Sequence, residues 1–242
     1  MDETTIQPAD ETVSRRGALL QLGGLAASAL GAGAWGAREL LDPDGAEAAA
    51  AGPAAVAGGL VSCVLTPEQT EGPYFLEGDK VRRNITEGKA GVPLALRLTV
   101  LDVSTCKPIK GAAVDIWHCD ASGAYSGVQG DTGSFLRGIQ RTGAKGVAIF
   151  RTIYPGWYPG RTVHIHVKVA LGGNVVHTGQ LYFPDRVTDA VYARSPYSAR
   201  PNRSTRNGAD SIYRNGGSRS TLRITREGSL YIGALTMGVQ RS

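Results

Sequence analysis

Two histidines two residues apart, His164 and His166, are the most informative chemistry-bearing pair in the chain. They lie in a β-rich run, and because side chains alternate along a strand with a period of two, both imidazoles project from one face. Their ring nitrogens can therefore converge on one metal ion. Tyr158 lies six residues before His164, and Tyr125 lies further upstream in the chain. Two phenolates with two imidazoles suit a hard, oxidised metal, above all Fe(III), better than zinc.

The residues between and after the two histidines indicate which way the strand faces. Ile165, Val167 and Val169 are apolar and alternate with the histidines, so they are expected to face the core. His164 and His166 must then face the other way. The whole chain has four histidines, and the placement of two of them at this spacing favours a metal site over an ordinary solvated face.

The elements that must position these side chains are short strands separated by turns containing Gly and Pro. Strands are expected over residues 94–100, 112–118, 147–152, 163–170, 174–183 and 229–235. No stretch of comparable length has a convincing helical pattern, and residues 195–218, rich in Ser, Arg, Asn and Gly, are expected to form a long surface loop. This pattern predicts an all-β sandwich with long loops.

Five segments, in order, resemble the intradiol ring-cleavage dioxygenases, which are non-haem Fe(III) enzymes that open catechols between the two hydroxyl-bearing carbons. The segments are Thr70–Tyr74, Gly123–Tyr125, Pro155–Tyr158, Arg161–His166 and Gln180–Phe183. The resemblance implies a prealbumin-like β-sandwich. The chain lacks the long helical N-terminal region of catechol 1,2-dioxygenases, and it looks more like protocatechuate 3,4-dioxygenase and its exported single-chain relatives.

The resemblance also assigns the metal ligands: Tyr125, Tyr158, His164 and His166 would hold Fe(III). The family pattern selects Tyr158 over its neighbour Tyr154. By the same analogy Tyr158 leaves the metal when substrate binds, and the departing phenolate takes a substrate proton. The expected reaction consumes O2 and yields muconate-type diacids.

Four further residues receive roles by the same resemblance. Arg161 is expected to stabilise negative charge on the substrate, with a surface ion pair as its alternative role. Gln180 is expected to border the pocket for O2 and substrate. Tyr182 points the same way as Gln180 and is expected to line the substrate pocket. Tyr74 is expected to form a pocket wall, with plain packing as its alternative.

Two other functions remain open at this point. One is a cupin-like Zn, Cu or Fe(II) enzyme that uses His164, His166 and either His118 or His177. The other is a non-catalytic, transthyretin-like binding module that has the sandwich without the metal. The presence of all the expected ligand residues disfavours the second.

The first 48 residues are expected to be a twin-arginine export signal. Arg15 and Arg16 precede the uncharged run 17–37, and a small-x-small cleavage site follows at Ala46–Ala48. A transmembrane anchor is the alternative, but the run is rich in glycine. Residues 49–62 are expected to be an Ala/Gly-rich linker, and 63–242 the catalytic domain. The mature protein is then extracellular or at the cell surface, without stable membrane insertion.

The charge balance bears on partners. The chain has 26 basic and 21 acidic side chains, and residues 51–242 alone carry 23 and 13, a formal net charge of +10. The basic residues are scattered, and no nucleic-acid recognition motif accompanies them, so nucleic acid is not expected as a partner. The expected partners are a small catechol and O2, and the oligomeric state stays open.

Three cysteines are present in a chain expected to be exported, so one disulfide is predicted. Cys106 and Cys119 flank an extended strand, which would hold their Cα atoms beyond the ~7 Å that a disulfide allows. Cys63 is therefore expected to pair with one of these two, without a preference between them. Lipidation of Cys63 is the competing interpretation.

Overall fold

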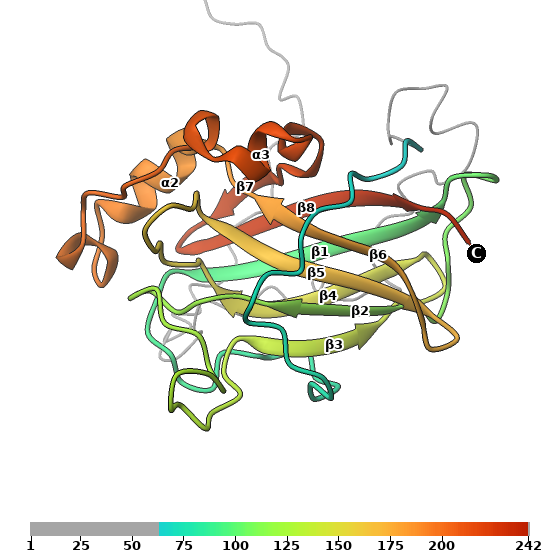
Figure 1. Cartoon of the computed structure of the whole chain (residues 1–242), viewed down its shortest axis with the longest axis horizontal. Helices are drawn as coiled ribbons and strands as arrows, with labels where there is room; N and C mark the ends of the chain where they lie inside the picture. The colour runs from blue at the N-terminus through green and yellow to red at the C-terminus, as the bar shows by residue number, and fades with distance from the viewer. Residues whose placement is uncertain (1–62, 242) are drawn as a thin grey trace, which may run out of the picture. The chain divides into compact units, whose positions relative to one another are not determined.

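Two four-stranded sheets stack face to face in the structure, a computed structural model that describes residues 63–241 (Figure 1). The strands are β1 Pro93–Asp102, β2 Ala113–Trp117, β3 Arg137–Arg141, β4 Val147–Ile153, β5 His164–Leu171, β6 Asn174–Tyr182, β7 Arg223–Glu227 and β8 Leu230–Val239. One sheet has the order β4-β1-β8-β7 and the other β3-β2-β5-β6. The predicted all-β sandwich is confirmed.

Alternation along the strands builds the core between the sheets. In β1, Leu94, Leu96 and Leu98 are fully buried, and from the facing sheet Ile165 and Val167 of β5 pack into the same cluster. Each fully buried aliphatic side chain of this kind contributes ~1.5–3 kcal/mol to folding. The inward positions of β5 thus anchor the strand and leave the alternate positions facing away from the core.

The strand register aligns particular side chains on that outer face of the β3-β2-β5-β6 sheet. His166 of β5 lies opposite Trp117 of β2 on one side and Gln180 of β6 on the other, and His164 lies opposite Tyr182. Directly opposed residues in antiparallel strands point to the same face. The sheet therefore gathers these five side chains on one surface.

Two edge strands, β3 and β7, do not appear among the expected elements. Their sequences, Arg137–Arg141 and Arg223–Glu227, are rich in charged residues, and the latter strand is mostly exposed. Charged side chains are common on edge strands, where they discourage pairing with other chains. They weaken the hydrophobic alternation by which a strand is recognised in the sequence.

The few helices are short, and the sequence did not identify them. Helix α2 spans Asp185–Tyr192 and α3 spans Ser211–Arg214, with the 3-10 turns η2 Tyr197–Ala199, η3 Asn207–Ala209 and η4 Gly217–Ser220 between or after them. Each is too short to establish a helical period in the sequence. The expectation of a surface loop over 195–218 is wrong in part, because the segment buries Tyr197 and Asp210.

A disulfide joins Cys63 to Cys106, whose Cα atoms lie 5.6 Å apart, and Cys119 is a buried free thiol. The expectation that Cys63 pairs with one of the other two cysteines is confirmed. The bond also uses the thiol that lipidation of Cys63 would need. The expected signal and linker, residues 1–48 and 49–62, lie outside the described residues. Within 63–241, no helix is long and apolar enough to cross a membrane.

Candidate metal centre

Strand β5 presents His164 and His166 on the face of the sheet opposite to the core, as the alternation predicts. Their Nε2 atoms lie 3.1 Å apart, and the two residues are only 2% and 1% exposed. Ile165, between them, packs into the core between the sheets. Two buried imidazoles therefore converge on one point with their Nε2 atoms.

A backbone carbonyl sets the tautomer of His164. Its Nδ1 lies 2.6 Å from the carbonyl oxygen of Thr162. Because a carbonyl oxygen can only accept a hydrogen bond, Nδ1 carries the proton and Nε2 presents a lone pair. The Tyr158 hydroxyl lies 3.1 Å from that Nε2. Metal-binding histidines are commonly oriented by such a contact on their other nitrogen.

His166 is oriented by packing. The indole of Trp117 stacks on its ring, with centroids 4.9 Å apart and an interplanar angle of 6°. Gly72 also lies close to this ring: an added Cβ would stand 3.1 Å from the imidazole Cε1, and the residue has φ +74°. A side chain at position 72 would therefore be strained and would press on the ring. Nδ1 of His166 has no hydrogen-bond partner among residues 63–241.

Both imidazoles are uncharged at neutral pH. Burial lowers the pKa of His164 to about 3, and the positive charge of Arg161 adds to the effect. Burial likewise holds the pKa of His166 well below its usual value, with the neighbouring His164 contributing. A neutral imidazole is the form that binds a metal ion.

Tyr125 is presented by a turn that follows β2. Asp120 organises this turn, since its Oδ1 accepts hydrogen bonds from Ser122 N–H at 2.9 Å and from Ala124 N–H at 3.1 Å. Aspartates stabilise turns in this way by replacing a backbone acceptor. Lys89 pairs with the other carboxylate oxygen at 2.9 Å. The buried Tyr125 hydroxyl completes no hydrogen bond with residues 63–241.

The two tyrosines form the other half of the cluster. The rings of Tyr125 and Tyr158 have centroids 5.9 Å apart, and that of Tyr125 lies 6.2 Å from His166. Burial raises the pKa of Tyr125 well above its ordinary value, and it raises the pKa of Tyr158 to about 12. Both are therefore neutral phenols unless a nearby cation holds them as phenolates.

These observations fit a strongly charged metal ion. One cation would satisfy all of these groups together: the buried Tyr125 phenol that has no hydrogen-bond partner among residues 63–241, and the two imidazoles whose Nε2 atoms converge. A hard trivalent ion accepts phenolate and imidazole ligands and lowers the pKa of a bound phenol. The side chains that could hold it are Tyr125, Tyr158, His164 and His166.

The remaining two histidines lie elsewhere. His118 is hydrogen-bonded through its ring nitrogens to the carbonyl of Cys119 at 2.8 Å and the hydroxyl of Thr152 at 2.7 Å. His177 lies with its Nδ1 3.2 Å from Glu68. No three His, Cys, Asp or Glu side chains gather as a possible metal site anywhere in residues 63–241. This contradicts the cupin-like alternative, which required a third histidine.

A polar group borders the cluster, and it contains three of the expected site residues. Arg161 donates through Nη2 to the Gln180 side-chain oxygen at 2.5 Å, and the Tyr182 hydroxyl donates to the same oxygen at 3.0 Å. Gln180 in turn donates to the carbonyl of Thr70 at 3.0 Å. The Tyr182 hydroxyl also lies 3.0 Å from the side-chain oxygen of Gln69, so its one proton is shared between the two amide oxygens. The Gln180 side chain thus links the sheet to the segment that covers it.

Tyr74 lies directly over the tyrosine pair. Its ring stacks on Tyr125 with centroids 4.5 Å apart and meets Tyr158 edge-on at 6.2 Å. It belongs to residues 68–79, here called the covering segment. Within that segment Glu71 forms an ion pair with Lys168 of β5. Tyr74 therefore packs against both tyrosines of the candidate site, and its role as a pocket wall stays a prediction.

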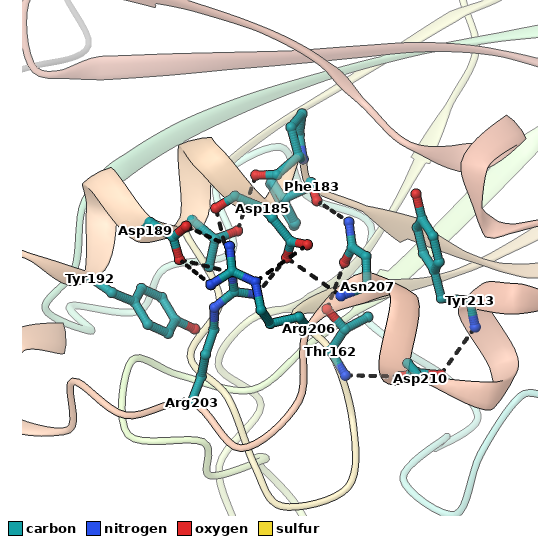
Figure 2. A network of polar contacts seen from close by, with 12 residues as sticks. Thr162, Phe183, Asp185, Asp189, Tyr192, Arg203, Arg206, Asn207, Asp210 and Tyr213 are labelled. Carbon is teal, nitrogen blue, oxygen red and sulfur yellow. Dashed lines mark hydrogen bonds and ion pairs between the residues drawn. The ribbon is translucent and has the colours of Figure 1, made fainter.

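Asp210 is a site neighbour that the sequence did not identify. It is 1% exposed, and its Oδ2 accepts hydrogen bonds from Arg161 Nε at 2.9 Å and from Thr162 N–H at 2.8 Å. Figure 2 shows the contact with Thr162. It lies in the segment expected to be a surface loop. An aspartate just before Ser211 is a signal for a helix N-cap, but nothing in the sequence indicates its contact with Arg161.

Comparisons with known proteins point to one family. A family model described as "Dioxygenase" matches residues 70–202, more than half of the chain. Catechol 1,2-dioxygenase 1 of Acinetobacter lwoffii is 36% identical over 104 residues, which is 38% of this chain and 32% of that protein. A chlorocatechol 1,2-dioxygenase of Pseudomonas putida is 30% identical over 135 residues, 47% of this chain and 52% of that protein. The chain thus spans about a third to a half of these curated relatives.

Solved structures match over more of the chain. An intradiol ring-cleavage dioxygenase from Tetranychus urticae has a TM-score of 0.71 and 39% identity, covering 74% of this chain and 95% of that one. The dioxygenase domain of a dioxygenase carbohydrate-binding protein fusion from Streptomyces sp. SirexAA-E has a TM-score of 0.59 and 34% identity, covering 74% and 100%. With the family model matched and nearly the whole of a solved relative covered, the chain belongs to the intradiol ring-cleavage dioxygenase family.

Proposed function

We propose that this protein is an Fe(III) enzyme that cleaves catechols between the two hydroxyl-bearing carbons with O2, giving muconate-type diacids. The convergence of a buried phenol (Tyr125), a half-buried phenol (Tyr158) and two neutral imidazoles carries the proposal. The metal would be held by Tyr125, Tyr158, His164 and His166. The names of the relatives, which include catechol and chlorocatechol 1,2-dioxygenases, support a catechol as substrate.

When bound, Fe(III) would supply a Lewis acid that polarises the two catechol oxygens and prepares the ring for reaction with O2. The chain supplies the proton transfers and the charge stabilisation. The Tyr158 oxygen, which lies 3.1 Å from His164 Nε2, is placed to take a proton from a substrate hydroxyl. The Arg161 guanidinium, anchored by Gln180 and Asp210, stabilises negative charge that develops on the substrate.

Aromatic side chains shield this chemistry from water. Tyr74, stacked on Tyr125, and Phe75, packed 5.0 Å from Trp117 between ring centroids, close one side of the cluster. A site of low dielectric strengthens the interaction of Arg161 with a charged substrate. The covering segment thus acts with the sheet to form the reaction chamber.

Metal analysis with visible spectroscopy tests the iron assignment. Protein produced in iron-replete cells should contain one iron per chain and show a visible tyrosinate-to-iron charge-transfer band. His164→Ala should lose both, because the remaining donors leave an incomplete site. His177→Gln, a buried histidine of β6 outside the cluster, is the matched control and should keep both. A colourless wild-type protein without iron would rule out the proposal.

Product analysis tests the reaction. With catechol, protocatechuate and chlorocatechols as the panel, the enzyme should consume one O2 per substrate and release a cis,cis-muconate-type diacid. A yellow hydroxymuconic semialdehyde would instead mean cleavage beside the diol. That outcome would exclude the intradiol reaction for this chain.

We also propose that the protein is exported by the twin-arginine pathway. The support is the pair Arg15 and Arg16 before an uncharged Gly/Ala-rich run, together with the Cys63–Cys106 disulfide, which is typical of an oxidising compartment. Replacement of both arginines with lysine should leave folded, iron-loaded precursor inside the cell. Undiminished secretion of that double variant would contradict the pathway.

A further inference from the structure

Asp210 occupies an unusual place for a buried carboxylate. It lies beyond residues 70–202, which the family model matches, in the segment between α2 and β7. It is the N-cap of α3: its Oδ1 accepts from Ile212 N–H at 2.8 Å and from Tyr213 N–H at 3.0 Å. A neutral Ser or Asn can cap a helix equally well, so the cap does not require the second carboxylate oxygen.

That second oxygen is directed at the candidate site. Oδ2 accepts from Arg161 Nε at 2.9 Å and from Thr162 N–H at 2.8 Å. Burial opposes the charge of Asp210, but hydrogen bonds from Thr162 and Tyr213 and the charge of Arg161 outweigh it, so the pKa is lowered and the group stays ionised. One carboxylate thus joins α3 to the turn that precedes β5.

The segment that carries Asp210 is itself firmly anchored (Figure 2). Asn207 accepts a hydrogen bond from the Thr162 hydroxyl at 2.6 Å and donates to the carbonyl of Phe183 at 2.9 Å. Arg203 pairs with Asp185 at 2.7 Å and with Asp189 at 2.8 Å. These contacts hold the segment in place, and with it the position of Asp210 relative to Arg161.

Two consequences follow for the site. Arg161 is held at Nε by Asp210 and at Nη2 by Gln180, and two anchors on a planar guanidinium fix both its position and its plane. Thr162, held through its N–H, directs its carbonyl to His164 Nδ1 at 2.6 Å. Thr162 has a second anchor in Asn207, which accepts from its hydroxyl at 2.6 Å, so the position of its carbonyl does not depend on Asp210 alone, whereas the position of the Arg161 Nε does.

We infer that Asp210 is a positioning residue for the reaction, which acts by holding the Arg161 guanidinium against the substrate pocket. The inference rests on the proposed function. Asp210 would then influence the rate of turnover although it lies in residues 195–218, which the sequence alone predicts to be a surface loop. It also separates two roles for Asp210, because capping of α3 uses Oδ1 and positioning of Arg161 uses Oδ2.

Two variants separate these roles. Asp210→Asn keeps the shape of the side chain but replaces one acceptor with a donor, and Asp210→Ser retains a cap acceptor for α3 while removing the arm to Arg161. Asp189→Asn is the matched control: it removes a carboxylate from the same network, 47% exposed and paired with Arg203 and Arg206, without touching Arg161.

The kinetic test compares iron-loaded variants with catechol as the probe. Both Asp210 variants should lower kcat by roughly tenfold to a hundredfold, with iron content and the affinity for catechol under anaerobic titration within about twofold of wild type. The control should match wild type. In an Arg161→Ala background, Asp210→Asn should change kcat by less than about twofold, because the group it positions is gone. Multiplicative losses in that double variant, or loss of iron in proportion to activity, would overturn the inference.

A crystal structure of Asp210→Asn gives a readout that does not depend on activity. The Arg161 guanidinium should leave its contact with Gln180, while α3 keeps its cap. A guanidinium that has not moved overturns the inference. If wild-type protein turns over no catechol, the proposed function fails instead, and the crystal structure still decides whether Asp210 positions Arg161. If Asp210→Asn does not fold, Asp210→Ser replaces it in every measurement.

Discussion

Tyr158 connects the tyrosine half of the cluster to the histidine half, and its hydroxyl is the central atom of the proposed proton transfer. It is 3.1 Å from His164 Nε2, and its ring meets those of Tyr125 and Tyr74 edge-on. A phenol here binds a cation only as phenolate, and burial alone favours the neutral form. In the proposed reaction this balance between phenol and phenolate would let Tyr158 leave the metal and accept a proton.

Tyr158→Phe tests this at a single oxygen. Three donors remain, so the variant should keep part of its iron, while kcat per iron should fall roughly a hundredfold because no phenolate takes the substrate proton. Tyr154→Phe is the control, since the Tyr154 hydroxyl contacts Thr188 at 2.7 Å in the core and not the cluster. Iron-normalised O2 uptake makes the measurement. Unchanged turnover per iron in Tyr158→Phe would refute the proton-transfer role.

A second residue-scale feature is the pair of carboxyls Asp79 and Asp115, where the covering segment meets β2. Burial raises the pKa of Asp115 to about 8, and the charge of Asp79 adds to it; burial also raises the pKa of Asp79. The charges of Lys168 and Arg137 act against the shift of Asp115 without cancelling it. At neutral pH the pair therefore retains a proton.

Stability should depend on pH through this pair. An unfolded aspartate has a pKa of ~3.9, so the protonated pair stabilises the fold fully below that pH, and the contribution is lost as pH rises through about 8. Asp115→Asn should remove this loss and raise Tm at pH 8 relative to wild type by more than at pH 5. Glu77→Gln, an exposed carboxyl nearby, is the control. Thermal unfolding at both pH values checks it; an equal effect at the two would contradict the assignment.

At the scale of elements, the site depends on loops that must be held against one another. Arg200 does this for the two tyrosine-bearing loops: its guanidinium donates to the carbonyl of Ser122 and, at 3.2 Å, to that of Trp157, and it lies 4.4 Å above the Trp157 ring. The loops meet closely at Gly123, where a Cβ would stand 2.4 Å from the Trp157 oxygen. Only glycine fits there.

Arg200→Met should loosen that junction. The stem can still cover the indole, but both hydrogen bonds are lost, so Tyr125 and Tyr158 are held less firmly. Release of iron to a chelator, followed by decay of the visible band, should be roughly tenfold faster. Arg223→Met on the exposed strand β7 should release iron at the wild-type rate. Equal rates for both variants would show that Arg200 does not support the centre.

At the scale of the whole molecule, stability and catalysis are built on different parts. The candidate site lies on the outer face of the β3-β2-β5-β6 sheet, whereas the disulfide tethers Cys63 near the end of β1, in the other sheet, with its sulfur close to the carbonyl of Val103. The bonded cysteines are separated by 43 positions in the chain, so the bond closes a long loop.

Removal of the disulfide should therefore affect folding and not the reaction. Cys63→Ser with Cys106→Ser should lower the free energy of unfolding by ~2–4 kcal/mol, because the unfolded chain gains loop entropy. Chemical denaturation of wild type and variant measures this. Iron content and kcat should stay within about twofold of wild type, and a large fall in either would mean that the disulfide supports the site.

Much of the local structure was predictable because it depends on neighbours in the chain. The period of two along β5 places His164 and His166 on one face and Ile165 in the core, whatever the rest of the fold does. The length of the strand between Cys106 and Cys119 likewise excludes a bond between them. The charged edge strands β3 and β7 and the short helix α2 were missed, because their stability comes from packing rather than from a periodic pattern.

Only the tertiary structure decided which distant residues support the site. Asp210 reaches Arg161 across 49 positions of sequence, and Gln180 reaches Thr70 across 110. The choice of Cys106 as the partner of Cys63 was made in the same way. These contacts follow from how the segments pack on the sandwich, and side-chain type and spacing do not encode that packing locally. The chain thus carries its candidate ligands in short motifs, whereas the residues that hold them in place are assembled by the fold.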